Sequence, residues 1–378
     1  MPQINLATEF DKRIVERFKM TAVTSAAVNY NYKFDGSDTV YISSVNTMPM
    51  GNYTKSGTSR YGTPLDIGDT QQVVTLSKDR SFTGIIDKGD VQDQKIQKQA
   101  SACLLRQTDE VITPEIEEYR LGKMAAKPGY VAVDTDLATI AGGAADVYDV
   151  FLAMNAAVTN GLAPKTGRVC FVTPNVIAMF LRSGGKFLQY GERSQEMIIK
   201  GIVGEVGGVQ IIEVPESIMP DNCVMLMAHK DATVAVEKLK DFTIHENPPG
   251  INGNLIEGRI RYDAFVLDVK VPLIAAAYSA GTLCVAPTIT YTAGSTNTIA
   301  LTTTTTSGVI KYTLDGSDPR TSSTATTYDS TTPTPISTAD WAASNGSTIV
   351  KAYTSKASCL DSVVTTATVG VASALTRS

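Results

Sequence analysis

Short runs of alternating apolar and polar side chains before residue 90 predict an extended arm. Strand patterns cover Thr39–Ser43, Gln72–Ser77 and Ser81–Asp87, and the stretch Gly51–Gly62 between the first two is rich in Gly, Ser, Thr and charge. Such a stretch holds too little apolar surface for a core, and an isolated two-stranded hairpin is marginally stable in water. The pattern therefore predicts an arm that must lie on another surface, supplied by neighbouring copies of the chain.

A long helix is predicted directly after the arm. Asp90 can cap its amino terminus, and Pro128-Gly129 stops it after Lys127. Apolar residues recur mostly three or four positions apart and form one stripe, at Ile96, Ala100, Cys103, Leu104, Val111, Ile112, Ile116, Tyr119 and Met124. At about 1.5 Å per residue this spine could span roughly 50 Å, although Pro114 must kink it or divide it at Thr113.

From Tyr130 to about Glu237 helix and strand patterns alternate, which is typical of a compact α/β unit. The sequence predicts helices over Ala145–Thr159 and Pro174–Arg182 and strands over Gly167–Val172, Val209–Pro215 and Asn222–Ala228. Two further strand patterns, Asp241–His245 and Gly258–Pro272, follow this unit. We expect these last strands to return to the spine helix.

The composition changes abruptly near Pro287. Glu257 is the last glutamate, and residues 287–378 carry only five basic residues and five acids, all aspartate. Thr, Ser and Ala dominate, and β-branched runs recur with turn signals between them, at Thr288–Tyr291, Thr298–Leu301, Val309–Thr313, Thr348–Tyr353 and Ser362–Thr366. Regularly spaced short strands of this kind predict a small all-β sandwich, a second and self-contained domain.

The overall composition indicates a soluble globular protein with two or three domains. Of its 378 residues, 43% are hydrophobic and 19% are charged, and the net charge is -5. Acids near the amino terminus argue against a signal peptide, and the best apolar stretch, Val271–Ala286, is too short and interrupted for a membrane helix. The negative charge argues against a general nucleic-acid-binding module, whose affinity would come from clustered Lys and Arg.

The five cysteines lie far apart and contain no CxxC pair: Cys103, Cys170, Cys223, Cys284 and Cys359. This spacing suits reduced, buried thiols better than a disulfide framework or a zinc site. We therefore expect five structural thiols.

Other side chains that carry chemistry are few. His229 and His245 are the only histidines, and both are expected in or beside strands as ordinary polar residues. Gly184-Gly185-Lys186 lacks the flanking residues of a phosphate-binding loop, and Gly201–Gly208 lacks the glycine spacing of a dinucleotide fingerprint. No strand leads clearly into the second pattern, which we interpret as a turn entering the strand at Val209.

Two acidic patterns are explained without a metal-binding or catalytic site. Asp35–Asp38 and Asp315–Asp318 both read Asp-Gly-Ser-Asp, which favours a tight turn over calcium because the downstream glutamate of an EF-hand is absent. Glu115, Glu117 and Glu118 are first-turn acids, and a solvated helix face is favoured over a paired-carboxylate active site. The sequence predicts no cofactor, no metal and no enzymatic activity.

In the order of its predicted elements this sequence resembles tailed-phage major capsid proteins of the HK97 type. Four segments add to the resemblance: Phe82–Asp90, Thr113–Leu121, Arg168–Pro174 and Ala264–Val266. The resemblance covers residues 1–286. It implies an α+β HK97-like capsid fold, with an amino-terminal arm (1–34), an extended E-loop and spine helix in the first part of a peripheral domain (35–129), an axial α/β domain (130–237) and peripheral return strands (238–286).

The resemblance also implies a shell subunit whose extended loop overlaps an adjacent subunit while the axial domain packs around capsomer axes. Inter-subunit contacts are expected at Arg60, Tyr61, Leu65, Ile67, Lys78 and Arg80. Expected partners are further copies of the chain in hexamers and pentamers, a scaffolding protein, portal and head-completion proteins, and packaged double-stranded DNA in weak, non-specific contact. No membrane partner is expected.

Two processing features of the family are weighed against this sequence. Some members carry a cleaved amino-terminal scaffolding segment, and since none is visible, a separate scaffolding protein or a trimmed chain is expected. Lys55, Lys78 and Lys88 lie in or near the loop, but no paired Asn and catalytic acid identifies the covalent cross-link of the type member.

Residues 287–378 resemble the immunoglobulin-like module at the carboxyl end of chitobiase and β-hexosaminidase enzymes. The matching residues are Lys311–Pro319, Tyr328, Pro335-Ile336 and Ile349–Tyr353. In that family the module is accessory, so the resemblance implies attachment or decoration. Trp341 is expected to fill its core rather than to stack on a sugar.

Together these observations predict a virion protein that forms an icosahedral head shell around phage DNA. Assembly is expected in the bacterial host cytoplasm, with the immunoglobulin-like domain displayed on the outer surface. One alternative is an encapsulin-like nanocompartment shell, which would enclose a cargo protein. The other is a carbohydrate-binding or carbohydrate-active protein, which would need a carboxylate pair in a cleft.

Overall fold

The computed structural model describes thirteen segments of the chain, and the statements below apply to them. They are residues 22–32, 39–45, 52–57, 60–61, 69–88, 100–138, 147–182, 202–292, 298–328, 336–337, 347–357, 359–370 and 373–374. Several predicted features fall outside these segments, namely the helix cap at Asp90, the loop residues Leu65 and Ile67, the patterns Asp35–Asp38 and Gly184–Lys186, and Trp341.

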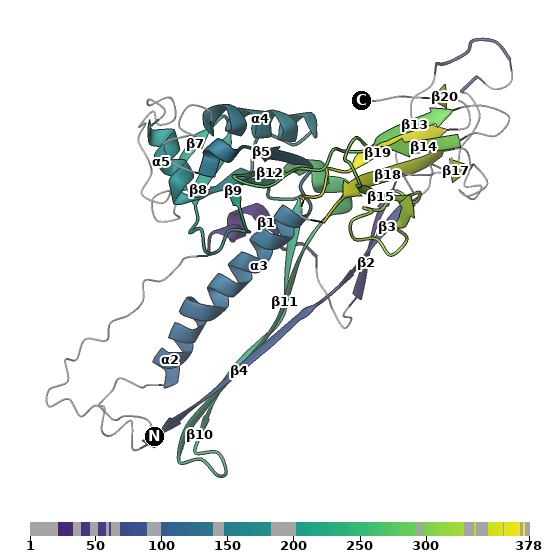
Figure 1. Ribbon diagram of the computed structural model, residues 1–378. Coiled ribbons are helices and arrows are strands. Elements are labelled where there is room, and N and C mark those ends of the chain that lie inside the picture. Colours follow the sequence, from purple (N-terminus) through teal and green to yellow (C-terminus); the bar gives the residue numbers. More distant parts are fainter. Residues whose placement is uncertain are drawn as a thin grey trace.

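A six-stranded sheet forms the largest layer of the body (Figure 1), with the strand order β5-β12-β9-β6-β8-β7. Its strands are Tyr130–Val133 (β5), Arg168–Val172 (β6), Ile202–Val206 (β7), Val209–Glu213 (β8), Cys223–His229 (β9) and Ile274–Tyr278 (β12). The pairs β5/β12 and β6/β8 are parallel, and the other neighbours are antiparallel. The sheet is therefore mixed, with parallel and antiparallel neighbours.

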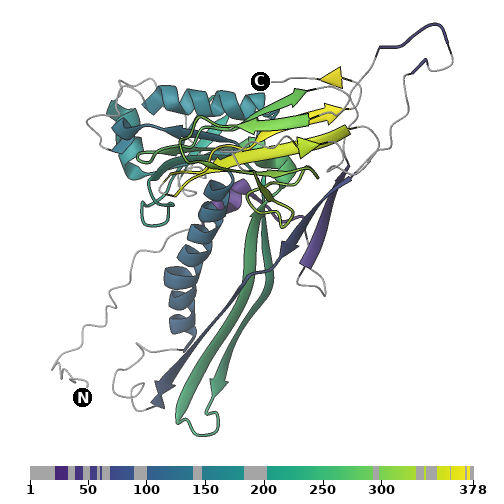
Figure 2. The ribbon, with the colours of Figure 1, turned by 45° about the vertical axis from the view of Figure 1, so that its right-hand side comes forward.

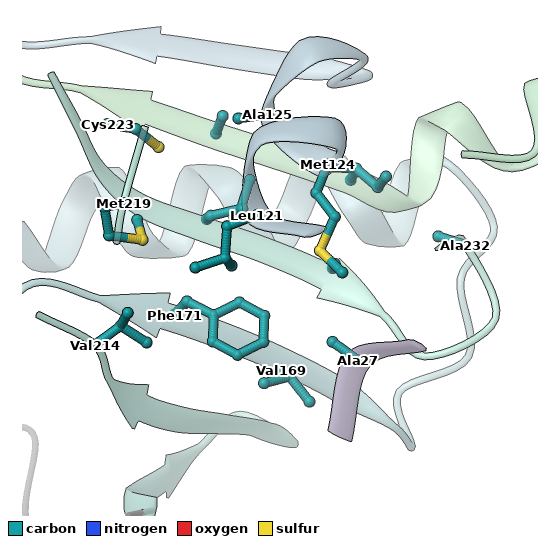
Figure 3. Close-up of a cluster of buried hydrophobic side chains, with 14 of the residues drawn as sticks. Ala27, Leu121, Met124, Ala125, Val169, Phe171, Val214, Met219, Cys223 and Ala232 are labelled. Atoms are coloured by element: carbon teal, nitrogen blue, oxygen red, sulfur yellow. The ribbon is translucent and has the colours of Figure 1, made fainter. Parts of the chain in front are cut away.

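Helices cover both faces of this sheet. One face packs against α4 (Val147–Asn160) and α5 (Pro174–Arg182), and the other against the carboxyl end of α3 (Thr113–Ala126) and the short 3-10 helix η1 (Thr24–Ala27). Figure 3 shows the second layer, in which Phe171 of β6 lies next to Leu121 of α3. Strands buried on both faces read as continuous apolar runs, which explains the fully buried β6, β9 and β12.

One prediction about this sheet was wrong. Residues 274–278 are predicted as peripheral return strands, but β12 lies inside the six-stranded sheet, where its three central alanines fit between two helix layers. Strand β7 lies within the pattern Gly201–Gly208, and Gly207-Gly208 forms the predicted turn into the strand at Val209. Both glycines adopt positive φ angles, 60° and 82°, which the tight turn requires.

A long, narrow four-stranded sheet, β1-β10-β11-β4, extends away from the body (Figures 1 and 2). Its strands are Val28–Asn29 (β1), Lys78–Asp87 (β4), Thr233–Glu246 (β10) and Gly253–Val266 (β11). Strand β4 had been predicted as part of the protruding arm. Instead it pairs with β11 along its whole length, from Lys78 opposite Tyr262 to Asp87 opposite Gly253. The strand pattern predicted over Gly258–Pro272 ends at Val266, and η4 (Asp268–Leu273) follows.

The spine helix lies along this narrow sheet (Figure 1). It consists of α2 (Ala100–Gln107), a π-helical turn η2 (Thr108–Ile112) and α3, which continue one another without a break. Ile112 and Ile116 pack on Ile260 and Tyr262, whereas Val111 of the predicted stripe is half exposed. Of the two outcomes predicted for Pro114, a kink or a division at Thr113, the division does not occur.

The π-helical turn explains how the helix tolerates proline. The Thr113 backbone N–H donates to the carbonyl oxygen of Thr108, and the Thr113 hydroxyl donates to the same oxygen at 3.0 Å. This wider turn precedes Pro114, which falls in the first turn of α3, where its missing N–H is least costly.

The carboxyl-terminal region, residues 287–378 and here called the C-terminal module, contains two small antiparallel sheets. One has the order β13-β14-β17 and the other β16-β15-β18-β19-β20. Their bounds are Thr288–Thr292 (β13), Thr298–Thr302 (β14), Val309–Thr313 (β15), Thr326–Tyr328 (β16), Ile336–Ser337 (β17), Ser347–Ser355 (β18), Thr365–Gly370 (β19) and Ser373–Ala374 (β20). Ile299 and Leu301 from one sheet share a core with Ile310 and Val350 from the other. Its immunoglobulin-like character stays a prediction.

Candidate assembly surface

A two-stranded hairpin presents the most prominent uncovered apolar face among the described residues. Strand β2 (Thr39–Val45) pairs antiparallel with β3 (Asp69–Thr75), and the pairing sets Tyr41 directly opposite Val73. Tyr41 is 66% exposed and Val73 is 56% exposed, and Val45 is also exposed. Side chains alternate across a strand, so these residues share the face of the ribbon that the body does not cover. We call this face the outer hairpin face.

The opposite face of the hairpin packs on the chain's own body. Val74 shares a cluster with Phe265 of β11 and with Val40 and Ile42 of β2. The Gln72 side-chain amide donates to the carbonyl oxygen of Val266 at 2.9 Å, and its amide oxygen accepts from the backbone N–H of Asp268 at 3.1 Å. The prediction that the arm cannot be covered by its own chain is therefore correct for one face and wrong for the other.

The described part of the loop between β2 and β3 is held by its own contacts. Tyr53 and Tyr61 meet edge to face, with ring centroids 5.1 Å apart, and the Thr54 N–H donates to the carbonyl oxygen of Arg60 at 3.0 Å. The Arg60 side chain donates to the carbonyl oxygen of Gly57, whose φ of 91° favours glycine. Tyr61 is nevertheless 91% exposed. Figure 2 shows these residues at the upper right, beyond the C-terminal module.

Lys78 and Arg80, two of the predicted contact residues, face the spine helix of their own chain. The Lys78 ammonium lies 5.2 Å from the ring centroid of Tyr119, and the Arg80 guanidinium forms an ion pair with Glu115 at 2.8 Å. Burial raises the pKa of Tyr119 to about 12, and its hydroxyl donates to Asp263 at 2.8 Å. Of the six predicted contact residues, the structure places Arg60 and Tyr61 together on an exposed loop.

Glu117 anchors the amino-terminal segment to the spine helix. Its carboxylate accepts hydrogen bonds from the backbone N–H groups of Val23 and Thr24, at 2.9 and 2.8 Å, and from the Thr24 hydroxyl at 2.6 Å. The residue is only 1% exposed. The prediction that Glu117 lies on a solvated face was wrong, because its helix turn is covered by η1, whose first N–H groups need an acceptor.

Arg120, one turn further along, balances the charge of Glu117. Its guanidinium lies 3.6 Å from the Glu117 carboxylate and 3.0 Å from that of Glu237 at the start of the long strand β10. It also lies over the ring of Tyr30, at 5.8 Å from the centroid. Three parts of the chain that are distant in sequence thus meet at one ionic network, in which Glu117 and Arg120 are buried and Glu237 is exposed.

A second ionic network joins the C-terminal module to the body. The Lys127 ammonium pairs with Asp268 at 2.9 Å, and the Arg320 guanidinium pairs with Asp318 at 2.8 Å. The two pairs are linked because the Asp318 N–H donates to the Asp268 carboxylate at 3.5 Å, and Arg320 donates to the carbonyl oxygen of Pro128 at 3.3 Å. We call these four charged residues, with Lys351, the junction cluster.

Two residues of the junction cluster, Asp318 and Lys351, have shifted pKa values. Burial acts to raise the pKa of Asp318, but the hydrogen bonds and positive charge of Arg320 outweigh it and hold that pKa below the ordinary value. Burial also lowers the pKa of Lys351, although Asp268 and Asp318 attract its positive charge. The module is therefore docked through charge that is withdrawn from water, which fixes its orientation on the spine.

The remaining residues with potential chemistry have structural partners. His229 ends β9 with Nε2 at 3.0 Å from the carbonyl oxygen of Thr166, and His245 on β10 faces Glu257 at 3.3 Å. Asp315 accepts hydrogen bonds from the backbone and hydroxyl of Ser317, which confirms the predicted turn. In the described segments, no group of three or more His, Cys, Asp or Glu side chains could hold a metal ion.

Two further observations bear on function. Within the described part of the chain, no helix has the length and apolar character of a membrane span. A groove between α4 and η4 carries no carboxylate in its lining, which consists of Gly129, Tyr130, Ala153, Ala156, Ala157, Asn160, Gly161 and Pro272.

Sequence reasoning missed both ionic networks. Glu117 and Arg120 stand three residues apart on one helix face, which is the spacing of an ion pair, but this spacing is as common on solvated faces as on buried ones. Asp318 and Arg320 also lie close in sequence, whereas Lys127 and Asp268 are brought together only by the fold. No local pattern could have identified the last pair.

Comparisons with solved structures give one consistent result. The chain is similar to a structure from Mycobacterium phage Che8, with 16% identity and a TM-score of 0.55 over 73% of this chain and 98% of that one. It is similar to the capsid structure of the cyanophage P-SCSP1u (12% identity, TM-score 0.56, 73% and 93% covered). A third match is the mature capsid of bacteriophage PhiM1 (16% identity, TM-score 0.54, 72% and 91% covered).

These matches show the fold: the chain has the mixed helix and strand fold found in phage capsid structures. No protein-family model matches the chain, and no curated protein matches it. The comparison is therefore one of architecture.

Proposed function

We propose that this protein is a major capsid protein that assembles, in many copies, into the icosahedral head shell of a tailed phage around double-stranded DNA. The observation that carries the proposal is the fold, which covers more than nine tenths of each of the three phage structures described above. Its role is structural. Hexamers and pentamers of the chain, with scaffolding, portal and head-completion proteins as partners, would be assembled in the bacterial host cytoplasm and would end in the virion.

The outer hairpin face explains why copies of the chain would associate. A shell closes through many modest, repeated contacts, and each contact needs apolar surface that the isolated subunit leaves in water. Tyr41 and Val73 form such a surface on a ribbon that is fixed at its base, and Tyr61 extends it at the loop. We propose that these residues, with Arg60 and the predicted Leu65 and Ile67, lie against a neighbouring subunit.

The C-terminal module is proposed to be an immunoglobulin-like decoration on the outer surface of the shell. The three matches leave about a quarter of this chain uncovered, a share similar to that of residues 287–378. The module has its own core, and the junction cluster holds it firmly on the body. Protease treatment of intact particles tests the orientation, because trypsin should reach Lys311 and Lys356 only if the module faces outward.

The two alternatives are less well supported. An encapsulin-like shell is not favoured, because the matched structures described above come from phages. A carbohydrate-active protein would need a carboxylate pair in a cleft, and the groove beside α4 has no carboxylate in its lining. The content of purified particles separates the shell candidates, since DNA indicates a phage head and an enclosed protein indicates a compartment.

Electron microscopy of the purified protein, with and without its scaffolding partner, tests the proposal directly. The wild-type chain should form closed shells, and the double variant Tyr41→Ser with Val73→Ser should remain as soluble subunits with an unchanged circular dichroism spectrum. Val309→Ser, which alters an exposed apolar residue on the module, is the matched control and should assemble normally. Normal shells from the double variant would disprove the role of the hairpin face.

A further inference from the structure

Two cysteines that are far apart in sequence meet where the C-terminal module joins the body. The Leu360 N–H donates to the carbonyl oxygen of Thr282 at 2.8 Å, and the Cys284 N–H donates to the carbonyl oxygen of Leu360 at 3.0 Å. These bonds form a parallel bridge with Leu283 opposite Leu360. The linker that leads into the module is thus paired with the segment that follows β18. Cys284 follows Leu283 in one of the two paired segments, and Cys359 precedes Leu360 in the other.

The bridge therefore brings these two cysteines close together. Burial, followed by the nearby Cys359, raises the pKa of Cys284. Both thiols are free. Cys284 is buried, whereas Cys359 is partly exposed, so a small reagent in solution can reach one member of the pair.

The other three cysteines do not share this arrangement. Cys170 and Cys223 are buried in the layers on opposite faces of the six-stranded sheet, and burial raises the pKa of both thiols. Cys103 lies on the spine helix and packs beside Ile86 and Ile256. All five thiols are free, as predicted, but Cys103 and Cys359 are partly exposed and not buried.

We propose that Cys284 and Cys359 form an intrachain disulfide when the protein meets an oxidising small disulfide such as oxidised glutathione. The bond would close a covalent ring around residues 285–358, which contain most of the module. It would also link the linker covalently to the segment after β18, where the ion pairs of the junction cluster already join the module to the body. The inference concerns the joint alone and does not depend on the function proposed above.

The chemistry balances as a thiol–disulfide exchange. The Cys359 thiolate attacks one sulfur of the small disulfide, which releases one small thiol and leaves a mixed disulfide on Cys359. The Cys284 thiolate then attacks the Cys359 sulfur and releases the second small thiol. The two cysteines lose two electrons and two protons, and the small disulfide gains both as it becomes two thiols.

A closed ring should stabilise the module, because a cross-link lowers the conformational entropy of the unfolded chain. Trp341 is the only tryptophan of the sequence and lies within residues 287–378. Since the sequence predicts that Trp341 fills the core of the module, its fluorescence should follow the unfolding of this region. Oxidation should move the urea midpoint of that transition upward, and dithiothreitol should reverse the shift.

The test uses the full chain incubated with oxidised glutathione, then alkylated under denaturing conditions and digested with trypsin. We expect the peptide 271–311, which contains Cys284, to be joined to the peptide 357–377, which contains Cys359, until a reductant is added. Alkylatable thiols should fall from five by two. Cys284→Ala and Cys359→Ser should each abolish the linked peptides and the shift in the urea midpoint, whereas Cys103→Ser should keep both.

Two results would overturn the proposal. One is a wild-type protein in which both cysteines stay alkylatable after treatment that forms a mixed disulfide on Cys359, since the thiols would then be too far apart to close. The other is equal cross-linking of Cys359 to Cys103 and to Cys284, which would indicate random exchange through unfolded protein. If Cys284→Ala fails to fold, Cys359→Ser with the peptide map decides the question.

Discussion

The hairpin β2–β3 and the C-terminal module are both rich in Thr and Ser and antiparallel, yet they bury their apolar side chains differently. In the module, two sheets enclose Ile299, Ile310 and Val350, which have no exposed surface. In the hairpin, one face packs on the body while Tyr41 and Val73 on the other stay in water. The difference is the number of layers, since a two-stranded ribbon has no second sheet to cover its outer face.

This difference shows that composition does not decide whether an appendage needs a partner. Both segments have β-branched runs separated by polar turns, and what separates them is whether the chain returns often enough to build an opposing layer. The same reasoning applies to polar groups. The described amino-terminal residues 22–32 pack into the core of the body, and Glu117 and Arg120 on the spine form hydrogen bonds with Thr24. A segment folds as part of the body when the body supplies its hydrogen-bond partners and covers its apolar side chains.

The largest loss of stability is expected when a buried side chain is removed from the core of the module. Ile310→Ala should cost about 4 kcal/mol of the module's unfolding free energy, because it removes a fully buried side chain and leaves a cavity. Tyr41→Ala on the hairpin should change subunit stability by less than about 0.5 kcal/mol, since its site is already solvated. Urea unfolding followed by Trp341 fluorescence and by circular dichroism measures both.

Equal losses of stability from these two substitutions would contradict the contrast between the appendages. Ile289→Ala, at a partly buried position of the same module core, should fall between them and serves as the internal scale.

A smaller effect is expected at the anchor of the amino-terminal segment. Glu117→Gln should cost about 3 kcal/mol, because it leaves the buried Arg120 with one carboxylate partner fewer and weakens three hydrogen bonds. Hydrogen exchange at the amides of Val23 and Thr24 should accelerate with it. Glu118→Gln, one residue away on the exposed side, is the control. Slow exchange at both amides in the Glu117 variant would mean that other contacts hold the segment.

How much of the fold and of the assembly surface can be predicted from the sequence depends on how far apart in the sequence the interacting residues lie. Patterns with a local cause were predicted well: α5 has its predicted bounds, β6 begins one residue after its prediction, and the Asp315 turn follows from its own side chain. The two-stranded arm was recognised because alternation exposes an uncovered face. Such features need no knowledge of the rest of the chain.

Except at Pro114, where a neighbouring π-helical turn decides the outcome, the failures described here involve partners that are distant in sequence. Strand β4 has the same alternation of apolar and polar side chains whether it pairs with β3 or with β11. Its place in the four-stranded sheet could therefore not be predicted from the sequence. Glu117 appears as a surface acid until η1 is placed over it. Lys78 and Arg80 have partners on the spine of their own chain that the sequence could not reveal, and their contact with a neighbouring subunit stays a prediction.

A pH-dependent effect is expected at the junction cluster. The folded pKa of Asp318 lies below its unfolded value of about 3.9, so its ion pair stabilises the module above that pH, and this stability is lost as the pH falls through the folded pKa. Asp318→Asn should cost about 2 kcal/mol at neutral pH and should flatten this acid dependence. Trp341 fluorescence in urea, measured between neutral pH and pH 2, checks it. An unchanged acid profile in the variant would show that another carboxylate is responsible.

The smallest effect is expected for the exposed ion pair between Arg80 and Glu115. A pair at the surface contributes less than about 1 kcal/mol, and salt screens it. Arg80→Ala and Glu115→Gln should therefore lower subunit stability slightly, show a small coupling in a double-mutant cycle, and lose that coupling at high salt. Because the structure gives Arg80 a partner on its own spine helix, both variants should assemble equally well, in contrast to a Tyr61→Ser variant at the loop. If Arg80→Ala alone blocked shell formation while Glu115→Gln did not, Arg80 would contact a neighbouring subunit as the sequence first predicted, and the assembly surface would extend from the hairpin onto β4.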